Sequence, residues 1–542
     1  MPILKSSSEA FPASRKVMSD IPYVLRVEFR DLARETHKIV GKPIACHKCN
    51  GFLMSADQIQ HDPKVGKHFV CPFCGTLNVI EGEIVIAGNE TEFVVQPPPE
   101  KTTSRGQVAP AGGSFLAVID VSGSMAGANL AAVKRSLTTS IESLAANSPE
   151  TLFGLVEFES SVAVRNLETG ERVEVPCETF ANLDQIMEAT KRLLDRVRLI
   201  KVGPNLSGLK RHVSSLREMG GTALGPAVAV AYVIAKHRNI ARVVLLTDGL
   251  ANEGIGALEG YQVTPAGSYY ATLGTMFREL GTAFDVVGIA SGAGMELKTL
   301  GLLPEATGGQ MYYVTPNELD RSLSELAGAS LLGRDVEIRL LTPKGVRVKD
   351  ASGVSRAAIE EITKTGSGRI GAVGEDHELY VEVEPESEIR SAQVPVQVQV
   401  TYTDEEGARR VRAVSTNLRV TSDERDLVAT LDPTMSATFV TQKAGEDAFG
   451  GKRAAGADRI AGFRAALAKK TKAAPKAVQA RMKRADDALA SEEANLQEME
   501  SKMAAAPAQG GAPCAAADEA FTRGFKQMKR SSKELFDEKE DE

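Results

Sequence analysis

The stretch FLAVIDVSGSMAGANL, residues 115–130, joins an apolar run to a short polar loop. Asp120 ends the apolar run, and Ser122 and Ser124 follow at alternate positions. Gly123 lets the backbone bend between the two serines, so both hydroxyls can turn toward the point that the carboxylate faces. One carboxylate and two hydroxyls make half of the oxygen shell that a hard cation requires. The loop is therefore a candidate metal site that needs further ligands.

Two residues far along the chain can complete this shell. Thr222 lies in GGTALGPA and Asp248 lies in VVLLTDGLANEG. Each falls where we expect a loop at the carboxyl edge of a sheet, which is where open α/β sheets bind ligands. Mg²⁺ (or Mn²⁺) suits two acids and three hydroxyls better than Ca²⁺ does, because Mg²⁺ binds few carboxylates and keeps its water molecules. One coordination position then stays available for an acidic group from outside.

The five residues resemble the metal-ion-dependent adhesion site of von Willebrand factor type A domains. That motif has Asp-x-Ser-x-Ser after a first strand, a later Thr, and Asp-Gly after another strand. Its positions are matched by Asp120, Ser122, Ser124, Thr222 and Asp248. The flanking stretches FLAVIDVSGSM, VVLLTDG and EATGGQMYYV are also similar to that family. The resemblance implies that a bound Mg²⁺ takes an exposed Asp or Glu of a partner protein.

Other interpretations of these residues stay open. Asp, Ser and Thr are also common helix caps and turn residues, and a complete shell could serve structure alone. Metal-dependent hydrolysis would need a base over the ion, for which only Glu157 or Glu253 is a candidate. No His lies close in sequence to Asp120 or Asp248, and no phosphate loop or Gly-x-Ser-x-Gly elbow occurs. We therefore expect a binding protein and not an enzyme.

Four cysteines predict a second metal site. Cys46 and Cys49 form one Cys-x-x-Cys pair, Cys71 and Cys74 form another, and 21 residues separate the pairs. Two such knuckles give tetrahedral coordination to one structural Zn²⁺, which closes the site and folds a module too small for its own core. A RING cross-brace is an alternative, but it would need about eight ligands. A thioredoxin-like redox site is another, but it would need one cysteine pair in a strand-helix setting and not two facing pairs.

The remaining cysteines and two histidines are expected to have no ligand role. Cys177 and Cys514 stand far apart and are expected to be plain thiols. His212 and His237 fall in helical stretches and are expected to be surface or packing residues.

Composition sets the class of protein. The chain has 542 residues, a formal net charge of -7, 43% hydrophobic and 25% charged residues, and no Trp. The mild charge speaks against nucleic-acid binding. No apolar run is long enough for a transmembrane helix, and no secretory core begins the chain. We expect a cytoplasmic protein of several domains.

Hydrophobic periodicity predicts the elements that position both sites. Apolar runs alternate with helical patterns from 114 to 330, which predicts a doubly wound, mostly parallel α/β sheet. From 331 the period becomes two, which predicts an antiparallel β-sandwich, and after 421 the pattern is helical. The predicted segments are disorder at 1–20, the zinc ribbon with flanking strands at 21–95, a linker at 96–113, the type A domain at 114–330, the sandwich at 331–421, helices at 422–505, and a flexible tail with an amphipathic helix at 506–542.

The order of these segments resembles the inner-layer subunits of the COPII vesicle coat. Two departures weaken this resemblance: the chain lacks length for the gelsolin-like domain that those subunits carry, and its adhesion-site motif is complete where theirs is usually eroded. Our main prediction is therefore a non-enzymatic adaptor or scaffold that binds a partner's acidic residue through Mg²⁺. The alternative is a COPII-like trafficking subunit, which would be recruited peripherally to membranes.

Overall fold

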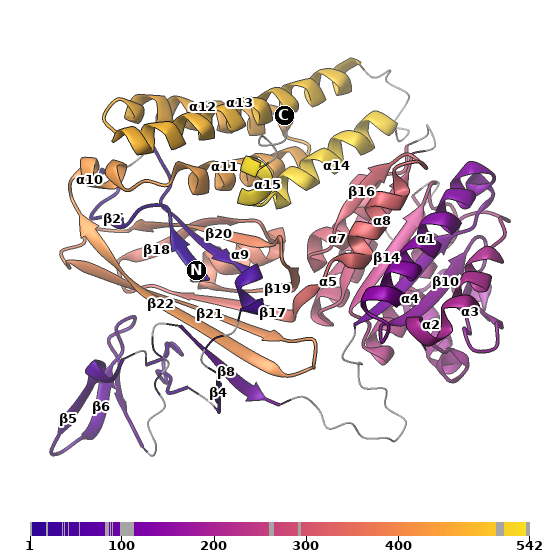
Figure 1. The fold of residues 1–542 in the computed structure, drawn as a ribbon, viewed down its shortest axis with the longest axis horizontal. Coiled ribbons are helices and arrows are strands. Elements are labelled where there is room, and N and C mark those ends of the chain that lie inside the picture. The colour runs from indigo at the N-terminus through magenta and orange to yellow at the C-terminus, as the bar shows by residue number, and fades with distance from the viewer. Residues whose placement is uncertain are drawn as a thin grey trace.

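The computed structural model describes residues 3–17, 20–34, 36, 38–41, 43–53, 55–81, 86, 88, 90–97, 113–258, 265–290, 294–505 and 514–537. An α/β domain lies beside a β-sandwich, a layer of helices covers one side of the sandwich, and a small zinc ribbon projects from the opposite side (Figure 1). The predicted fold class, with its mostly parallel sheet, antiparallel sandwich, zinc ribbon and helical segment, is confirmed.

The α/β domain is built on an eight-stranded sheet of order β12-β11-β10-β9-β14-β15-β16, with β13 paired to β10. Its strands are β9 Ser114–Asp120, β10 Leu152–Phe158, β11 Val162–Arg165, β12 Arg172–Val175, β13 Ile200–Lys201, β14 Arg242–Thr247, β15 Ala283–Ile289 and β16 Met311–Val314. The helices are α1 Ala128–Asn147, α2 Leu183–Leu193, α3 Val202–Ser214, α4 Leu224–Arg238, α5 Ala266–Glu279, α6 Leu297–Leu300, α7 Leu302–Thr307 and α8 Leu319–Gly328. Short 3₁₀ turns occur at η3 Gly123–Met125, η4 Cys177–Thr179 and η5 Leu194–Arg196.

The central strands β9, β10, β14 and β15 are buried at every position and mostly apolar, because helices cover both faces of the sheet. Along β9, Leu116 and Val118 enter the core that contains α4 and α5, whereas Ala117 and Ile119 enter the core that contains α1, α3 and α8. β9 is parallel to both of its neighbours, β10 and β14. The loops that follow β9 and β14 therefore leave the sheet at the same edge, which is where the sequence placed the metal site.

The sandwich takes strands from three parts of the chain. One sheet has the order β1-β3-β20-β18, and the other has the order β19-β17-β21-β22-β8-β4 with β2 added beside β22. The late strands are β17 Leu331–Leu341, β18 Val346–Ser352, β19 Ser367–Gly374, β20 Glu378–Pro385, β21 Gln393–Thr403 and β22 Arg409–Thr421, with helix α9 at Arg356–Thr365. The early elements are β1 Leu4–Ser6, β2 Ala10–Pro12, β3 Val24–Glu28, η1 Phe29–Ala33, β4 Lys38–Val40 and β8 Glu90–Gln96. Residues 331–421 therefore do not form the sandwich alone.

The expectation of disorder at residues 1–20 is wrong for the described part of that segment. Ile3 and Phe11 are fully buried in the sandwich core. Ser7 and Ser8 are buried as well, and their hydroxyls form hydrogen bonds with backbone groups. Ser7 Oγ accepts a hydrogen bond from Val24 N, and Ser8 Oγ donates one to Leu427 O. A Ser-rich segment can thus be ordered when other elements supply its partners.

The helical layer follows the sandwich and reaches back to the α/β domain. Its helices are α10 Glu424–Ala429, α11 Pro433–Phe449, α12 Arg453–Thr471, α13 Lys476–Ala505, α14 Ala515–Lys529 and α15 Ser532–Asp537. The expectation of a flexible tail is wrong for residues 514–537, while 506–513 and 538–542 lie outside the described residues. Phe525 is fully buried, and the Asp518 carboxylate accepts hydrogen bonds from the backbone of Met295 and Leu297. Packing on two other layers therefore holds α14 in place.

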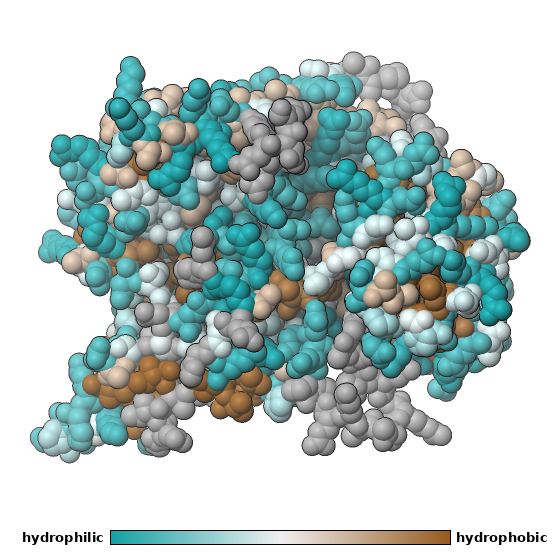
Figure 2. All heavy atoms as spheres, in the orientation of Figure 1, coloured by the Kyte–Doolittle hydropathy of each residue, from teal (hydrophilic) through white to brown (hydrophobic). Residues whose placement is uncertain are grey.

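The zinc ribbon contains η2 Ala56–Gln58 and a three-stranded sheet of β5 Ile59–Asp62, β6 Gly66–Val70 and β7 Leu77–Val79. Its side chains Val70, Leu77 and Val79 are about half exposed, and hydrophobic atoms gather over this region in Figure 2. The predicted linker at 96–113 lies mostly outside the described residues. Among the helices that the structure describes, none has the length and apolarity needed to span a membrane.

Candidate functional site

Asp120 is the last residue of β9 and is fully buried. Both of its carboxylate oxygens have donors: Ser122 N donates to Oδ1 over 2.8 Å, and Thr247 Oγ1 donates to Oδ2. Thr247 ends β14, the neighbouring strand. The sheet thus fixes the orientation of the carboxylate before any ligand binds, and Thr247 is a supporting residue that the motif did not reveal.

Three more of the predicted ligands lie in one chain of short contacts. Ser122 Oγ is 3.0 Å from Ser124 Oγ, and Ser124 Oγ is 2.7 Å from Asp248 Oδ1. These are the lengths of ordinary hydrogen bonds between the side chains. The hydroxyl and carboxylate oxygens are also the type of ligand that Mg²⁺ prefers. Asn129 Nδ2 donates to the other oxygen of Asp248 and so orients it, a role that the sequence did not indicate.

Thr222 is brought to the same edge but not into this chain of contacts. Its loop is tied to the Asp120 loop by two backbone hydrogen bonds, Met219 N to Val121 O over 2.8 Å and Gly123 N to Gly220 O over 3.1 Å. The hydrogen bonds that join Asp120, Ser122, Ser124 and Asp248 to their neighbours do not include the Thr222 hydroxyl. Its place in the shell stays a prediction.

Two glycines allow the Thr222 loop to approach so closely. Gly220 has φ of +64°, and a Cβ there would lie 2.4 Å from Glu159 Oε2. A Cβ on Gly221 would lie 2.2 Å from Glu253 Oε1. Thr222 N also donates a hydrogen bond to Asn252 Oδ1. The loop is therefore held between the Glu159 loop on one side and the Asn252 loop on the other. Gly220 is favoured by its positive φ, whereas a Cβ on Gly221 would have to displace the end of the Glu253 side chain.

Burial raises the pKa of Asp120 to about 6, and the nearby Asp248 carboxylate acts in the same direction. Hydrogen bonds from Ser122 and Thr247 lower the pKa but do not offset burial. Two carboxylates in a buried site repel each other, and a divalent cation between them would remove that cost. The electrostatics of the site therefore favour a bound cation.

The two candidate bases for hydrolysis are occupied by other contacts. Glu157 pairs with Arg165 and Arg172, and Glu253 Oε1 accepts a hydrogen bond from Ser160 Oγ over 2.8 Å. Each carboxylate stabilises loop or strand structure beside the site.

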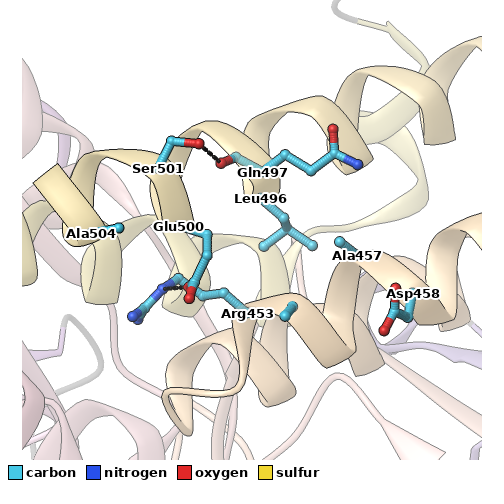
Figure 3. A pocket seen from close by; sticks show the side chains of 9 residues that line it. Arg453, Ala457, Asp458, Leu496, Gln497, Glu500, Ser501 and Ala504 are labelled. Atoms are coloured by element: carbon cyan, nitrogen blue, oxygen red, sulfur yellow. Dashed lines mark hydrogen bonds and ion pairs between the residues drawn. The ribbon is translucent and has the colours of Figure 1, made fainter.

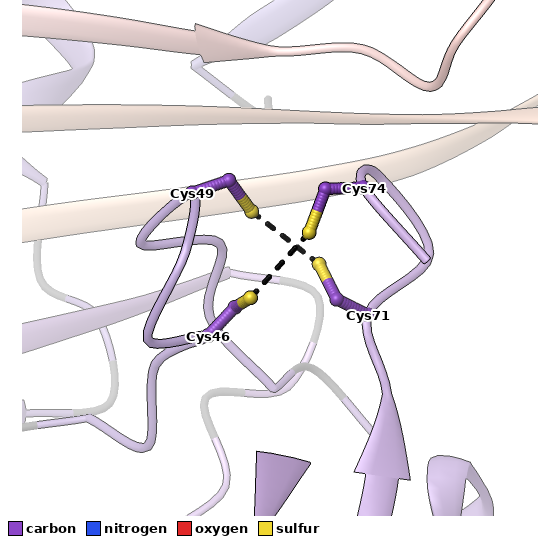
Figure 4. A group of neighbouring side chains, drawn as sticks. All are labelled: Cys46, Cys49, Cys71 and Cys74. Carbon is purple, nitrogen blue, oxygen red and sulfur yellow. Dashed lines mark hydrogen bonds between the residues drawn. The ribbon is translucent and has the colours of Figure 1, made fainter. Parts of the chain in front are cut away.

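The four predicted zinc ligands converge in the ribbon (Figure 4). Cys46 Sγ lies 3.5 Å from Cys74 Sγ, and Cys49 Sγ lies 3.4 Å from Cys71 Sγ. All four sulfurs lie within 4.8 Å of one another. A tetrahedral Zn²⁺ with bonds of about 2.3 Å needs sulfurs about 3.8 Å apart, so the thiols fit one ion.

Cys177, Cys514, His212 and His237 lie outside both candidate sites in the described structure. His212 Nε2 lies 3.1 Å from Leu167 O, and Cys177 is exposed and Cys514 partly exposed.

Comparisons with known proteins find similarity to vesicle-coat proteins and to a Ras protein. The family model described as the Sec23/Sec24 trunk domain matches residues 110–327. Over 463 residues the chain is 25% identical to the protein named circularly permutated Ras protein 1 of Dictyostelium discoideum, covering 78% of this chain and 54% of that protein. Over 501 residues it is 23% identical to protein transport protein SEC24-2 of Naumovozyma castellii, covering 83% of this chain and 54% of that protein. The chain thus spans about half the length of these curated relatives.

The fold extends this similarity to nearly the whole chain. The structure is similar to the crystal structure of the human COPII-coat protein Sec24c with a TM-score of 0.70 and 17% sequence identity, covering 98% of this chain and 75% of that chain. The predicted resemblance is confirmed: residues 110–327 match the model of the Sec23/Sec24 trunk domain, and the fold resembles that of a COPII-coat protein over nearly the whole chain.

Proposed function

We propose that the chain is a non-enzymatic scaffold subunit of a vesicle coat, similar to Sec24. The observation that carries this proposal is the match to Sec24c over 98% of the chain, which includes zinc ribbon, trunk, sandwich and helices in one connected fold. Identity to SEC24-2 over 501 residues supports it from sequence. This reverses the order of our predictions, because the coat alternative now has more support than the adaptor.

A coat subunit of this kind would work at the cytoplasmic surface of a membrane and associate with it peripherally. Its recruitment would depend on a small GTPase, and one relative is itself named a Ras protein. The chain should therefore co-sediment with vesicles that carry a membrane-anchored small GTPase when a non-hydrolysable GTP analogue is present. With GDP, or without the GTPase, the sedimented fraction should fall to background. Equal sedimentation in all three conditions would refute the proposal.

A second candidate function is metal-dependent protein binding at the trunk. It is favoured by the 2.7 and 3.0 Å contacts that join Ser122, Ser124 and Asp248 beside the buried Asp120. Bound Mg²⁺ would supply a positive charge that attracts a carboxylate. Ser124 is exposed, so an ion bound beside it would be accessible to an Asp or Glu of a partner protein. Thr222 would join the shell, and Asp248 would bind the ion directly or through water.

Metal binding can be tested without knowing the partner. Calorimetric titration of the full chain with Mg²⁺ and with Mn²⁺ should give one binding event at the trunk that Asp120→Ala abolishes. Asp184→Ala, at an exposed position of α2, is the matched control and should bind metal normally. If Asp120→Ala binds metal as the unaltered chain does, the trunk site is not where we place it. Phosphatase and nuclease assays in Mg²⁺ should give background rates.

A further inference from the structure

Helix α14 joins the helical layer to the trunk. It lies between the two in the connected fold (Figure 1). Phe525 and Met528 of α14 are fully buried in the same hydrophobic core as Leu297 of α6 and Met311 of β16. A helix that follows the sandwich and most of the helical layer in the chain thus completes the core of the trunk on one side.

Asp518, in the first turn of α14, is buried against the trunk. Elsewhere in the helical layer charged side chains pair with each other, as the Arg453 guanidinium does with Glu500 over 2.9 Å at the groove between α12 and α13 (Figure 3). Asp518 instead receives backbone hydrogen bonds: Leu297 N donates to its Oδ1 over 2.7 Å, and Met295 N donates to its Oδ2. Its carboxylate therefore fixes the backbone of the trunk at these two residues.

The two donors flank a residue in a strained conformation. Glu296 lies between Met295 and Leu297 and has φ of +56°, which residues other than glycine rarely adopt. A backbone of this kind persists only where surrounding contacts hold it. The Asp518 carboxylate supplies such contacts on both sides of Glu296. Asp518 thus helps to hold the segment between β15 and α6 in its observed shape.

This segment is connected to the trunk metal site by a short series of contacts. A Cβ on Gly288 of β15 would lie 3.2 Å from Met295 Sδ and 3.3 Å from Leu297 Cδ1, so both side chains press against β15 at that residue. Gly288 is the register partner of Thr247 in the parallel strand β14. Thr247 Oγ1 in turn donates to Asp120 Oδ2. The contacts therefore run from α14 across two strands to the carboxylate of the site.

We propose that Asp518 is a positioning residue for the trunk metal site, so that docking of α14 and binding of Mg²⁺ stabilise each other. This inference rests on the proposed metal-dependent binding at the trunk. While α14 is docked, Met295 and Leu297 hold β15 against β14, and Thr247 keeps the orientation in which it fixes Asp120. Loss of the Asp518 contacts releases the strained segment and loosens that orientation. The helical layer thereby regulates the affinity of the trunk for its metal.

The first test is calorimetric titration of the full chain with Mg²⁺. Asp518→Asn keeps the shape of the side chain but leaves one acceptor oxygen for two backbone donors. The variant should bind Mg²⁺ at least about fivefold more weakly than the unaltered chain, which is the lower end of ordinary coupling between sites. Glu519→Gln is the matched control, because it removes the same charge at the next position, where Glu519 is partly exposed and pairs with Arg523 of the same helix. This control should bind Mg²⁺ as the unaltered chain does.

The second test needs no change in α14 and so does not depend on the folding of the Asp518 variant. Coupling between two sites is reciprocal, so a metal at the trunk must also stabilise the docked helix. Mg²⁺ should therefore slow amide hydrogen exchange of α14 and of Met295 and Leu297 in the unaltered chain. The same measurement on Asp120→Ala should show no effect of Mg²⁺. A contact that serves structure alone would leave the exchange of α14 independent of the metal.

The outcomes separate this inference from the function on which it rests. If the unaltered chain binds Mg²⁺ and Asp518→Asn binds it equally well, the inference is overturned and metal binding at the trunk stands, even if the variant melts at a lower temperature. Exchange of α14 that does not respond to bound Mg²⁺ would overturn it in the same way. If the unaltered chain binds no Mg²⁺ at the trunk, the proposed metal site is refuted and this inference with it.

Discussion

Replacing Asp120 by Asn tests the electrostatics of the trunk site. The pKa of about 6, against an ordinary 3.8, means that the ionised side chain costs about 3 kcal/mol in the folded state at neutral pH when no cation is bound. Asn removes the charge and keeps the shape, and its amide can still accept from Ser122 N. Without metal, Asp120→Asn should therefore be more stable than the unaltered chain by about 3 kcal/mol, which for a domain of this size is roughly 6 to 12 °C in melting temperature.

The pH dependence has a defined sign. A carboxyl whose folded pKa is raised contributes stability that is fully present below pH 3.8 and is lost as the pH rises through about 6. The advantage of Asp120→Asn should therefore be largest above pH 6 and should vanish near pH 4. Mg²⁺ should act in the opposite sense, stabilising the unaltered chain by about 2.7 kcal/mol at a hundredfold excess over its dissociation constant. The variant should gain little from Mg²⁺.

The assay is thermal unfolding in EDTA and in Mg²⁺, combined with amide hydrogen exchange of β9 and β14 to assign the transition to the trunk. Asp184→Asn, which changes the same charge at an exposed position of α2, should behave as the unaltered chain. The reasoning fails if Asp120→Asn is no more stable in EDTA, or if Mg²⁺ stabilises the variant as much as the unaltered chain.

Three further outcomes are expected. Cys71→Ser should remove the one bound zinc, measured by elemental analysis, and should speed amide exchange in the ribbon while exchange in the trunk stays unchanged; a protected ribbon without zinc would contradict this. Gly225→Ala should destabilise the trunk by about 3 kcal/mol or more, because its Cβ would lie 1.9 Å from Ile255 O. The control Gly267→Ala should be neutral, because no heavy atom lies within 4 Å of its Cβ. Equal melting temperatures of the two variants would count against the packing argument. Burial, together with the nearby Lys529, lowers the pKa of His377 to about 4 from 6.5. The free energy of unfolding should therefore be highest above pH 6.5 and fall by about 2 to 3 kcal/mol as the pH drops toward 4. The variant His377→Gln should lack this pH-dependent loss in acid denaturation.

Much of the candidate chemistry could be predicted because it is encoded by local spacing. The pairs Cys46/Cys49 and Cys71/Cys74 form knuckles whatever surrounds them, and their sulfurs meet as predicted. The loop after β9 likewise sets Ser122 beside Asp120 through one hydrogen bond between near neighbours. Continuous apolar runs predicted the parallel sheet, because only strands covered on both faces avoid polar alternation.

Residues without a spacing rule were missed. Asn129 and Thr247 orient the two carboxylates of the trunk site, but Asn in a helix and Thr at a strand end are common for many reasons. The position of Thr222 relative to the other predicted ligands depends on how its loop packs between two neighbouring loops. The positions of Asn129, Thr247 and Thr222 therefore follow from packing across the sheet edge.

The sequence by itself therefore determined the class of each layer and the convergence of the four cysteines, and it predicted a second metal site at the trunk. Only the tertiary structure decided that the first strands complete the sandwich and that the last helices pack on the trunk. Periodicity reports which face of an element is apolar, but not which distant segment covers that face. Ser8 and Asp518 illustrate this, because their buried polar atoms form hydrogen bonds with backbone groups far away in the chain.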